Sequence, residues 1–285
     1  MDFRRFFEEY AKNNITFWGV TMQNEPTTAL EDPGHNETRY FEAMFFNSTM
    51  ERDFAKGMWG PLLRATPTTR NLKLMMMDDN RVNAEEFADT VYGDSEANHY
   101  VDGMAVHWYY DGKTAPEVFT QIHEKYPNKF IMYTEACQNP PTFGAWKNAN
   151  DYMQYIIPIL NNWVNAWTDW NMVLDPSGGN GTQIATILVN STEEFEKQPM
   201  FYAQGHLSKW IVPNSVIVGL NINDQKAYSY QNLQAVAALT PNNQKVLVLN
   251  NRDNSMSYSV SIVNEQGNWV NLNLEANSFT TIVYN

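Results

Sequence analysis

The sequence predicts an α/β fold: a partial (β/α)8 TIM barrel, about its last five βα units, over residues 1–212 and an antiparallel β-sandwich-like domain over residues 213–285. Two observations predict it. Up to about residue 210, short apolar runs alternate with longer stretches of helical periodicity, as in βα units around a parallel sheet. After Pro213 the pattern changes to short β-branched runs separated by turn residues.

The first part begins with an expected amphipathic helix, because residues 2–10 alternate charged and aromatic side chains at helical spacing and lack the apolar segment of a signal peptide. The expected parallel strands span residues 16–23, 72–78, 103–109, 130–134 and 166–172. The expected helices span residues 40–64, 84–92, 116–125, 151–165 and 195–210. Since a closed barrel has eight strands, we expect roughly three units to be missing from the front.

The second part contains six short runs with β-branched and aromatic residues, typical of an antiparallel domain. These expected strands span residues 215–220, 233–239, 245–250, 257–263, 269–274 and 279–284. Residues 241–243 and 252–254 have the composition of hairpin turns. No Pro/Gly-rich linker separates the two parts, so we expect them to pack together.

Composition excludes several function classes. The chain has 285 residues, 43% of them hydrophobic, which is enough to bury a sizeable core. Its formal charge of -13 repels phosphate backbones, so we expect no nucleic-acid partner. With one cysteine, five scattered histidines and no phosphate-cradling glycine motif or GxSxG, the sequence predicts neither a metal site nor a cofactor, and no serine-hydrolase centre.

Candidate catalytic residues follow the expected strands, where loops at the carboxyl ends of parallel strands are free to vary. Glu25 and Glu135 follow the first and fourth strands and are the natural pair for glycoside hydrolysis, which needs one proton donor and one ionised carboxylate. Asn24 precedes Glu25 and is placed to bond a sugar 2-hydroxyl. The aromatic residues Trp108, Tyr109, Trp167 and Trp170 are candidates for flat walls of a sugar pocket.

Each of these residues also has a simpler interpretation. A lone Glu at a strand end is often a surface carboxylate or helix cap, and a Trp after a strand is often core. His107 is either an acid/base or a satisfied buried imidazole. Asp78 and Asp79 can bind a divalent ion or, more simply, pair with Arg81.

Taken together, these segments resemble the glucosylceramidases of glycoside hydrolase family 30, in the same order from about residue 2 to residue 284. The matching segments are residues 20–26 (VTMQNEP), 76–81 (MMDDNR), 103–109 (GMAVHWY), 134–137 (TEAC), 167–171 (WTDWN) and 197–209 (KQPMFYAQGHLSK). The resemblance implies a retaining β-glucosidase that cleaves glucosylceramide to glucose and ceramide, with Glu25 as acid/base and Glu135 as nucleophile. It further implies that a set of residues shapes the glucose pocket: Asn24, Asn80, His107, Trp108, Tyr109, Cys137 and Trp170.

The resemblance also implies a lysosomal or secreted protein whose partners are a saposin-type activator and the anionic lysosomal membrane surface. Residues 178–185 depart from the pattern, because they lack the aromatic and Asn residues that the family places there. Two alternatives stay open. One is a truncated or inactive family member that acts as a non-catalytic binding module, and the other is a family member that acts on another β-linked glycan.

Overall fold

The computed structural model describes residues 3–28, 44–138, 142–178, 184–223 and 232–285. The backbone forms two compact units. The first comprises Met1–Ala136 and Asn162–Asp169, and the second comprises Cys137–Asn161 and Trp170–Asn285. The predicted domain boundary after residue 212 stays a prediction.

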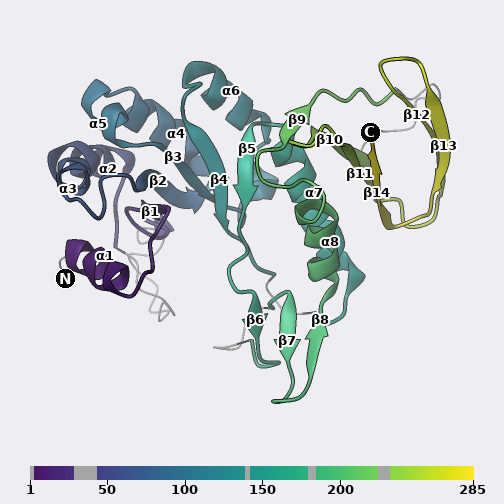
Figure 1. Cartoon of the computed structure of the whole chain (residues 1–285), viewed down its shortest axis with the longest axis horizontal. Coiled ribbons are helices and arrows are strands. Elements are labelled where there is room, and N and C mark those ends of the chain that lie inside the picture. The colour runs from purple at the N-terminus through teal and green to yellow at the C-terminus, as the bar shows by residue number, and fades with distance from the viewer. Residues whose placement is uncertain (1–2, 29–43, 139–141, 179–183, 224–231) are drawn as a thin grey trace. The chain divides into compact units, whose positions relative to one another are not determined.

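The first unit is built on a five-stranded sheet in the order β1-β2-β3-β4-β5, with all neighbouring strands parallel (Figure 1). The strands are β1 (Gly19–Thr21), β2 (Lys73–Asn80), β3 (Gly103–His107), β4 (Phe130–Glu135) and β5 (Val164–Trp167). The five predicted strands and their parallel pairing are therefore confirmed. β5 starts before the expected segment and ends at Trp167, so residues 168–171 are loop.

Helices of the first unit follow β1, β2 and β3, as in βα units, and one further helix precedes β1. They are α1 (Phe3–Lys12), α2 (Ser48–Phe54), α3 (Gly60–Ala65), α4 (Ala84–Phe87), α5 (Ser95–Tyr100) and α6 (Glu117–Lys125), with π-helical turns over Ala55–Trp59 and Ala88–Tyr92. The expected helix over 40–64 begins at Ser48, because the Asn47 side chain caps it by accepting from the Met50 N–H; residues 40–43 lie outside the described residues. Asp94 caps α5 in the same way, and that helix was not predicted from the sequence.

The centre of the sheet is apolar on both sides, as expected of parallel strands covered by helices. Leu74, Met76 and Met104 are fully buried, and helices α2 and α4 pack on β2. Gly103 begins β3 where the ring of Phe130 approaches so closely that a Cβ would lie 2.4 Å from it. Tight packing thus fixes the start of β3 against β4.

The end of β2 carries a bulge that determines which side chains reach the carboxyl edge. Met77 and Asp78 have φ values of 75° and 52°, in the left-handed region, and the pairing with β3 skips from Met77 to Asp79. The main chain therefore turns at Asp78, which is the extra residue in the bulge. Each such non-glycine residue costs about 1–3 kcal/mol of strain, which the surrounding contacts must offset.

The described residues of the second unit form the helices α7 (Trp146–Leu160) and α8 (Pro199–Ser208) and three antiparallel or mixed sheets. One sheet consists of β6 (Val173–Leu174), β7 (Ile187–Val189) and β8 (Phe195–Lys197). The four-stranded sheet consists of β9 (Val216–Val218), β10 (Leu233–Leu239), β11 (Lys245–Asn251) and β14 (Ser278–Tyr284). The third is a hairpin of β12 (Tyr258–Val263) and β13 (Trp269–Leu274). The six predicted β-domain strands are confirmed. The small sheet β6-β7-β8 was not predicted, and β8 occupies the start of the expected helix over 195–210, which begins instead at Pro199.

The four-stranded sheet and the β12-β13 hairpin share an apolar core. Ala235, Leu247, Leu249 and Leu274 form it, and alternate residues of β12 pack against it. The helices of this unit bond to the same sheet, since Asn161 after α7 donates to the Ala235 carbonyl at 2.9 Å and His206 in α8 contacts Thr281 at 2.8 Å. Within the part of the chain that the structure describes, no helix is both long and apolar enough to cross a membrane.

Candidate active site

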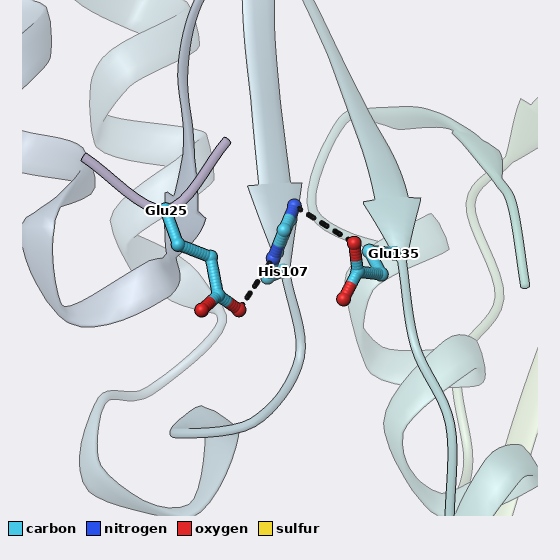
Figure 2. A group of neighbouring side chains, drawn as sticks. All are labelled: Glu25, His107 and Glu135. Atoms are coloured by element: carbon cyan, nitrogen blue, oxygen red, sulfur yellow. Dashed lines mark hydrogen bonds and ion pairs between the residues drawn. The ribbon is translucent and has the colours of Figure 1, made fainter. Parts of the chain in front are cut away.

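Three side chains from different strand ends meet at the carboxyl edge of the parallel sheet (Figure 2). Glu25 follows β1, His107 ends β3 and Glu135 ends β4. His107 Nδ1 lies 3.1 Å from Glu25 Oε1, and its Nε2 lies 3.9 Å from Glu135 Oε2. One oxygen of Glu25 and one oxygen of Glu135 lie within 4.8 Å of each other. The structure thus brings the predicted carboxyl pair together around one imidazole.

His107 is buried and held at both ring nitrogens. Nε2 also lies 3.1 Å from Asp78 Oδ1, so each nitrogen faces a carboxyl oxygen. Burial alone would lower the pKa of His107, but the hydrogen bonds to Asp78 and Glu25 and the charges of Asp78 and Glu135 raise that pKa to about 10. The imidazole is therefore a cation at acidic and neutral pH. It is a buried imidazole with both nitrogens hydrogen-bonded, and it also belongs to the charged cluster around the two glutamates.

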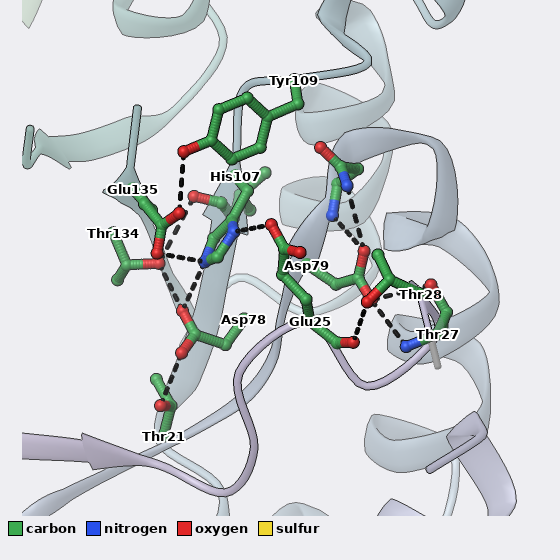
Figure 3. A network of polar contacts seen from close by, with 12 residues as sticks. Thr21, Glu25, Thr27, Thr28, Asp78, Asp79, His107, Tyr109, Thr134 and Glu135 are labelled. Atoms are coloured by element: carbon green, nitrogen blue, oxygen red, sulfur yellow. Dashed lines mark hydrogen bonds and ion pairs between the residues drawn. The ribbon is translucent and has the colours of Figure 1, made fainter. Parts of the chain in front are cut away.

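Glu135 is partly buried and receives a hydrogen bond. The Tyr109 hydroxyl donates to Glu135 Oε1 at 2.7 Å (Figure 3). Burial raises the pKa of Glu135, while the His107 charge and the Tyr109 bond oppose that rise. Two donors of different kinds, a cation and a phenol, therefore lie beside the carboxylate that the sequence analysis assigns as nucleophile.

Glu25 has a constrained backbone. Its φ is 45°, its N–H donates to the Asp78 carbonyl at 2.9 Å, and its carbonyl accepts from the Thr28 hydroxyl at 2.8 Å. Two residues further on, Asp79 Oδ2 accepts from both the N–H and the hydroxyl of Thr27, at 2.8 and 2.7 Å. The two consecutive aspartates of the bulge thus hold the main chain on both sides of Glu25 (Figure 3).

The cluster of Glu25, His107 and Glu135 also has the proximity of a metal-ligand set, which the linear spacing of histidines did not indicate. A metal needs an unprotonated ring nitrogen. Because Asp78 and Glu25 face the two nitrogens and the His107 pKa is raised to about 10, a proton competes with any metal at this ring. The donor set fits an acid cluster with a paired imidazolium better than a metal site.

The remaining predicted pocket residues differ in exposure. Asn24 is exposed beside Glu25, and Asn80 at the end of β2 is buried with its Oδ1 unbonded. Trp108 is buried and packs edge-on against Trp167, with ring centroids 5.7 Å apart, which is core packing. Cys137 (buried) and Trp170 (42% exposed) belong to the second unit. Their roles stay predictions, and residues 179–183 of the departing segment lie outside the described residues.

One simple interpretation from the sequence is wrong. Arg81 does not serve as the partner of the aspartate pair; its Nε lies 3.4 Å from Asp111 Oδ1, and both side chains are buried. Asp78 instead accepts hydrogen bonds from Thr21 on β1 and Thr134 on β4. Asp78 is a site residue that was not predicted from the sequence. The signal for it was the pair of acidic residues at a strand end, where regular alternation lets only one of two adjacent side chains face inward.

Comparison with known proteins places both parts of the chain. The model of the glycosyl hydrolase family 30 TIM-barrel domain matches residues 1–211, and the model of the family 30 beta sandwich domain matches residues 214–282.

Relatives of known name are similar over nearly the whole chain. "Putative glucosylceramidase 4" of Caenorhabditis elegans is 36% identical over 99% of this chain and 55% of its own length. "Lysosomal acid glucosylceramidase" of Mus musculus is 35% identical over 88% of this chain and 48% of its own length. The chain thus spans about half the length of the curated relatives it matches. A solved endo-β1,6-glucanase shares the fold at a TM-score of 0.79 and 22% identity, over 98% of this chain and 61% of that one.

Proposed function

The chain belongs to glycosyl hydrolase family 30, and from that membership we propose that it carries the site of a retaining glucosylceramidase. The substrate is the β-glucosidic bond of glucosylceramide, and the products are glucose and ceramide. The observation that carries the proposal is the carboxyl pair Glu25 and Glu135, which lie with one oxygen each within 4.8 Å around His107.

The separation of the two carboxyl groups supports a retaining rather than an inverting reaction. Retaining glycosidases place them about 5–5.5 Å apart, whereas inverting enzymes need about 6.5–9.5 Å to admit a water. An oxygen of Glu25 lies within 4.8 Å of an oxygen of Glu135, which is close to the retaining separation and well below the inverting one. Direct attack by a carboxylate is the chemistry that this geometry favours.

In the first step an oxygen of Glu135 attacks the anomeric carbon and forms a bond to it, while the bond from that carbon to the ceramide oxygen breaks. Glu25 gives its proton to the departing oxygen, so ceramide leaves as a neutral alcohol. In the second step a water oxygen attacks the anomeric carbon, its proton returns to Glu25, and the carboxylate of Glu135 is released. Two inversions leave the glucose in the β configuration.

The neighbours of the pair suit these roles. The His107 cation and the Tyr109 hydroxyl both stabilise a negative charge on Glu135, which the attacking carboxylate needs. The buried position of Glu25 and its constrained backbone hold its carboxyl group at one place, which proton transfer to a bound leaving group needs. Among the described side chains predicted for the glucose pocket, Asn24, exposed beside Glu25, and Tyr109, beside Glu135, are two that we expect to contact the sugar.

The proposal of a lipid substrate rests on the relatives that are named glucosylceramidases and are 35–36% identical to this chain. With it we propose a lysosomal or secreted location, a saposin-type activator and an anionic lysosomal membrane as partners. The chain has a formal charge of -13 at pH 7, so it approaches an anionic surface best at low pH, where carboxylates take up protons and the repulsion weakens.

The test is a substrate panel with product analysis. The 285-residue chain is incubated at mildly acidic pH with glucosylceramide in detergent micelles, with β-1,6-glucan and with xylan, and NMR follows which glucose anomer appears first. Cleavage of glucosylceramide with β-glucose released first supports the proposal. Turnover of a glycan alone identifies a family member with another β-linked substrate, and binding without turnover of any of them identifies a non-catalytic module.

A further inference from the structure

Asp78 lies at the centre of the polar network under the two glutamates (Figure 3). Its Oδ2 accepts a hydrogen bond from the Thr21 hydroxyl at 2.7 Å, and its Oδ1 accepts from the Thr134 hydroxyl at 2.6 Å and from His107 Nε2 at 3.1 Å. These partners stand on β1, β4 and β3, while Asp78 itself is on β2. One buried carboxylate therefore connects four adjacent strands at the carboxyl edge of the sheet.

The bulge in β2 is what brings this carboxylate to the interior. Asp78 is the unpaired residue between Met77 and Asp79 in the register with β3, and its φ of 52° reverses the direction in which its side chain would extend from a regular strand. Strained backbone of this kind persists only where surrounding contacts hold it. Here those contacts are the three hydrogen bonds to the Asp78 side chain and the bond from the Glu25 N–H to its carbonyl.

We propose that Asp78 is a positioning residue that acts through His107 on both candidate catalytic glutamates. By accepting from Nε2, it orients the imidazole so that Nδ1 donates to Glu25 and the cationic ring stays beside Glu135. The proposal deepens the proposed function and rests on it for the roles of the two glutamates.

The arrangement has an electrostatic consequence. The hydrogen bond to Asp78 is the strongest influence that raises the pKa of His107, ahead of the bond to Glu25, and together with the nearby carboxylate charges it outweighs the opposite effect of burial. The charge of His107 in turn opposes the rise that burial causes in the pKa of Glu135. Loss of the Asp78 charge should therefore change the pKa of Glu135 through His107, although the imidazole separates the two carboxyl groups.

The test substitutes Asp78→Asn, which keeps the size of the side chain and an oxygen acceptor but removes the charge. NMR titration of the imidazole nitrogens measures the charge of His107, one of five histidines, and a His107→Gln variant assigns its signals. In the native chain we expect both nitrogens to remain protonated up to about pH 9. In Asp78→Asn we expect the midpoint to fall from about 10 to between about 7 and 9, since one nearby opposite charge is worth about 1–3 pH units.

The matched control is Asp102→Asn. Asp102 also accepts three bonds, from Arg64, Lys73 and the Leu74 N–H, but at the opposite end of the strands. We expect this variant to leave the His107 midpoint and the kcat/KM unchanged. Asp78→Asn should lower kcat/KM about tenfold to hundredfold, since small displacements of catalytic groups cost that much, and should add an alkaline limb to the pH profile at the new His107 midpoint.

Two results would overturn the proposal. A native chain in which His107 is neutral at pH 8 contradicts the proposal. This measurement needs no variant, so the proposal can be tested even if Asp78→Asn does not fold. An unchanged midpoint in a folded Asp78→Asn variant contradicts it as well. The NMR titration needs no turnover, so it separates failure of this proposal from failure of the proposed function.

Discussion

Replacing Glu25 with Gln keeps the size of the side chain and removes the carboxyl proton that can be transferred to a leaving group. Glu25 Oε1 faces His107 Nδ1 at 3.1 Å, and the amide oxygen of a glutamine can accept the same hydrogen bond. The backbone contacts of residue 25, to the Asp78 carbonyl and from the Thr28 hydroxyl, do not involve the side chain. The variant should therefore fold normally and lose the ability to protonate a leaving group.

The size of the effect depends on the leaving group. The ceramide alcohol needs a proton as it departs, and general acid catalysis contributes about 10²–10⁴ in rate. At about 1.4 kcal/mol per factor of ten, this loss raises the barrier by about 3–5 kcal/mol. A 2,4-dinitrophenolate is stable as an anion and leaves without a proton, so cleavage of 2,4-dinitrophenyl β-glucoside should show little change in its first step.

The assay compares kcat/KM of native chain and Glu25→Gln for glucosylceramide and for the dinitrophenyl glucoside. The matched control is Glu51→Gln, the same substitution at a fully buried carboxyl group that bonds the Met77 N–H at 2.9 Å on the other side of the bulge. We expect the control to keep both activities. Equal losses on the two substrates with Glu25→Gln would refute the acid/base assignment, and so would an undiminished rate on glucosylceramide.

Three further predictions concern other parts of the first unit. Tyr109→Phe removes the donor to Glu135 Oε1, so kcat/KM should fall about tenfold to a hundredfold with little change in Tm; an unchanged rate would contradict this. Burial, with help from two neighbouring aspartates, raises the pKa of Glu51 from 4.5 to about 8, so the folded state holds an extra proton in that window and native stability should fall by up to about 1.4 kcal/mol per pH unit from about 4.5 to 8. Urea unfolding at pH 5 and 7.5 should show this slope in the native chain and not in Glu51→Gln, and equal slopes would contradict it. Leu74→Ala, at a fully buried position in β2, should cost about 2–5 kcal/mol of unfolding free energy in the same assay, and a loss under about 1 kcal/mol would mean that β2 is not core.

The strands were predictable because their apolar runs are long enough to signal burial. The apolar segments around Leu74, Met104 and Ile131 predicted three of the five parallel strands. Glu25 and Glu135 were predicted as polar residues that directly follow the first and fourth expected strands. Carboxyl ends of parallel strands meet at one edge, so pairing these residues needed no tertiary information beyond the fold class.

The role of Asp78 was not predictable in the same way. Alternation along a strand allows one of two adjacent residues to face inward, and only the left-handed backbone at Met77 and Asp78 lets both aspartates serve the site. No local propensity favours that conformation for Met or Asp over the regular strand. The contacts that stabilise it come from Thr21, Glu25, His107 and Thr134, which are distant from Asp78 in the sequence.

The short strands of the second unit were not predicted for a different reason. β6 has two residues and β7 and β8 have three each, too few to display a period of two. Phe195–Lys197 lies within the expected helix over 195–210, and only its pairing with Ile187–Val189 shows that it is a strand.

The central claim is that Glu135 is a nucleophile that forms a bond to glucose. Intact-mass analysis after exposure to 2-deoxy-2-fluoro-β-D-glucosyl fluoride at mildly acidic pH tests it most directly, with Glu135→Gln as control, because the fluorine slows release of the glycosyl-enzyme. We expect one added fluoroglucosyl group on the native chain, which peptide mapping should place on the peptide that contains Glu135, and none on the control. No adduct on the native chain, or the same adduct on Glu135→Gln, would contradict it.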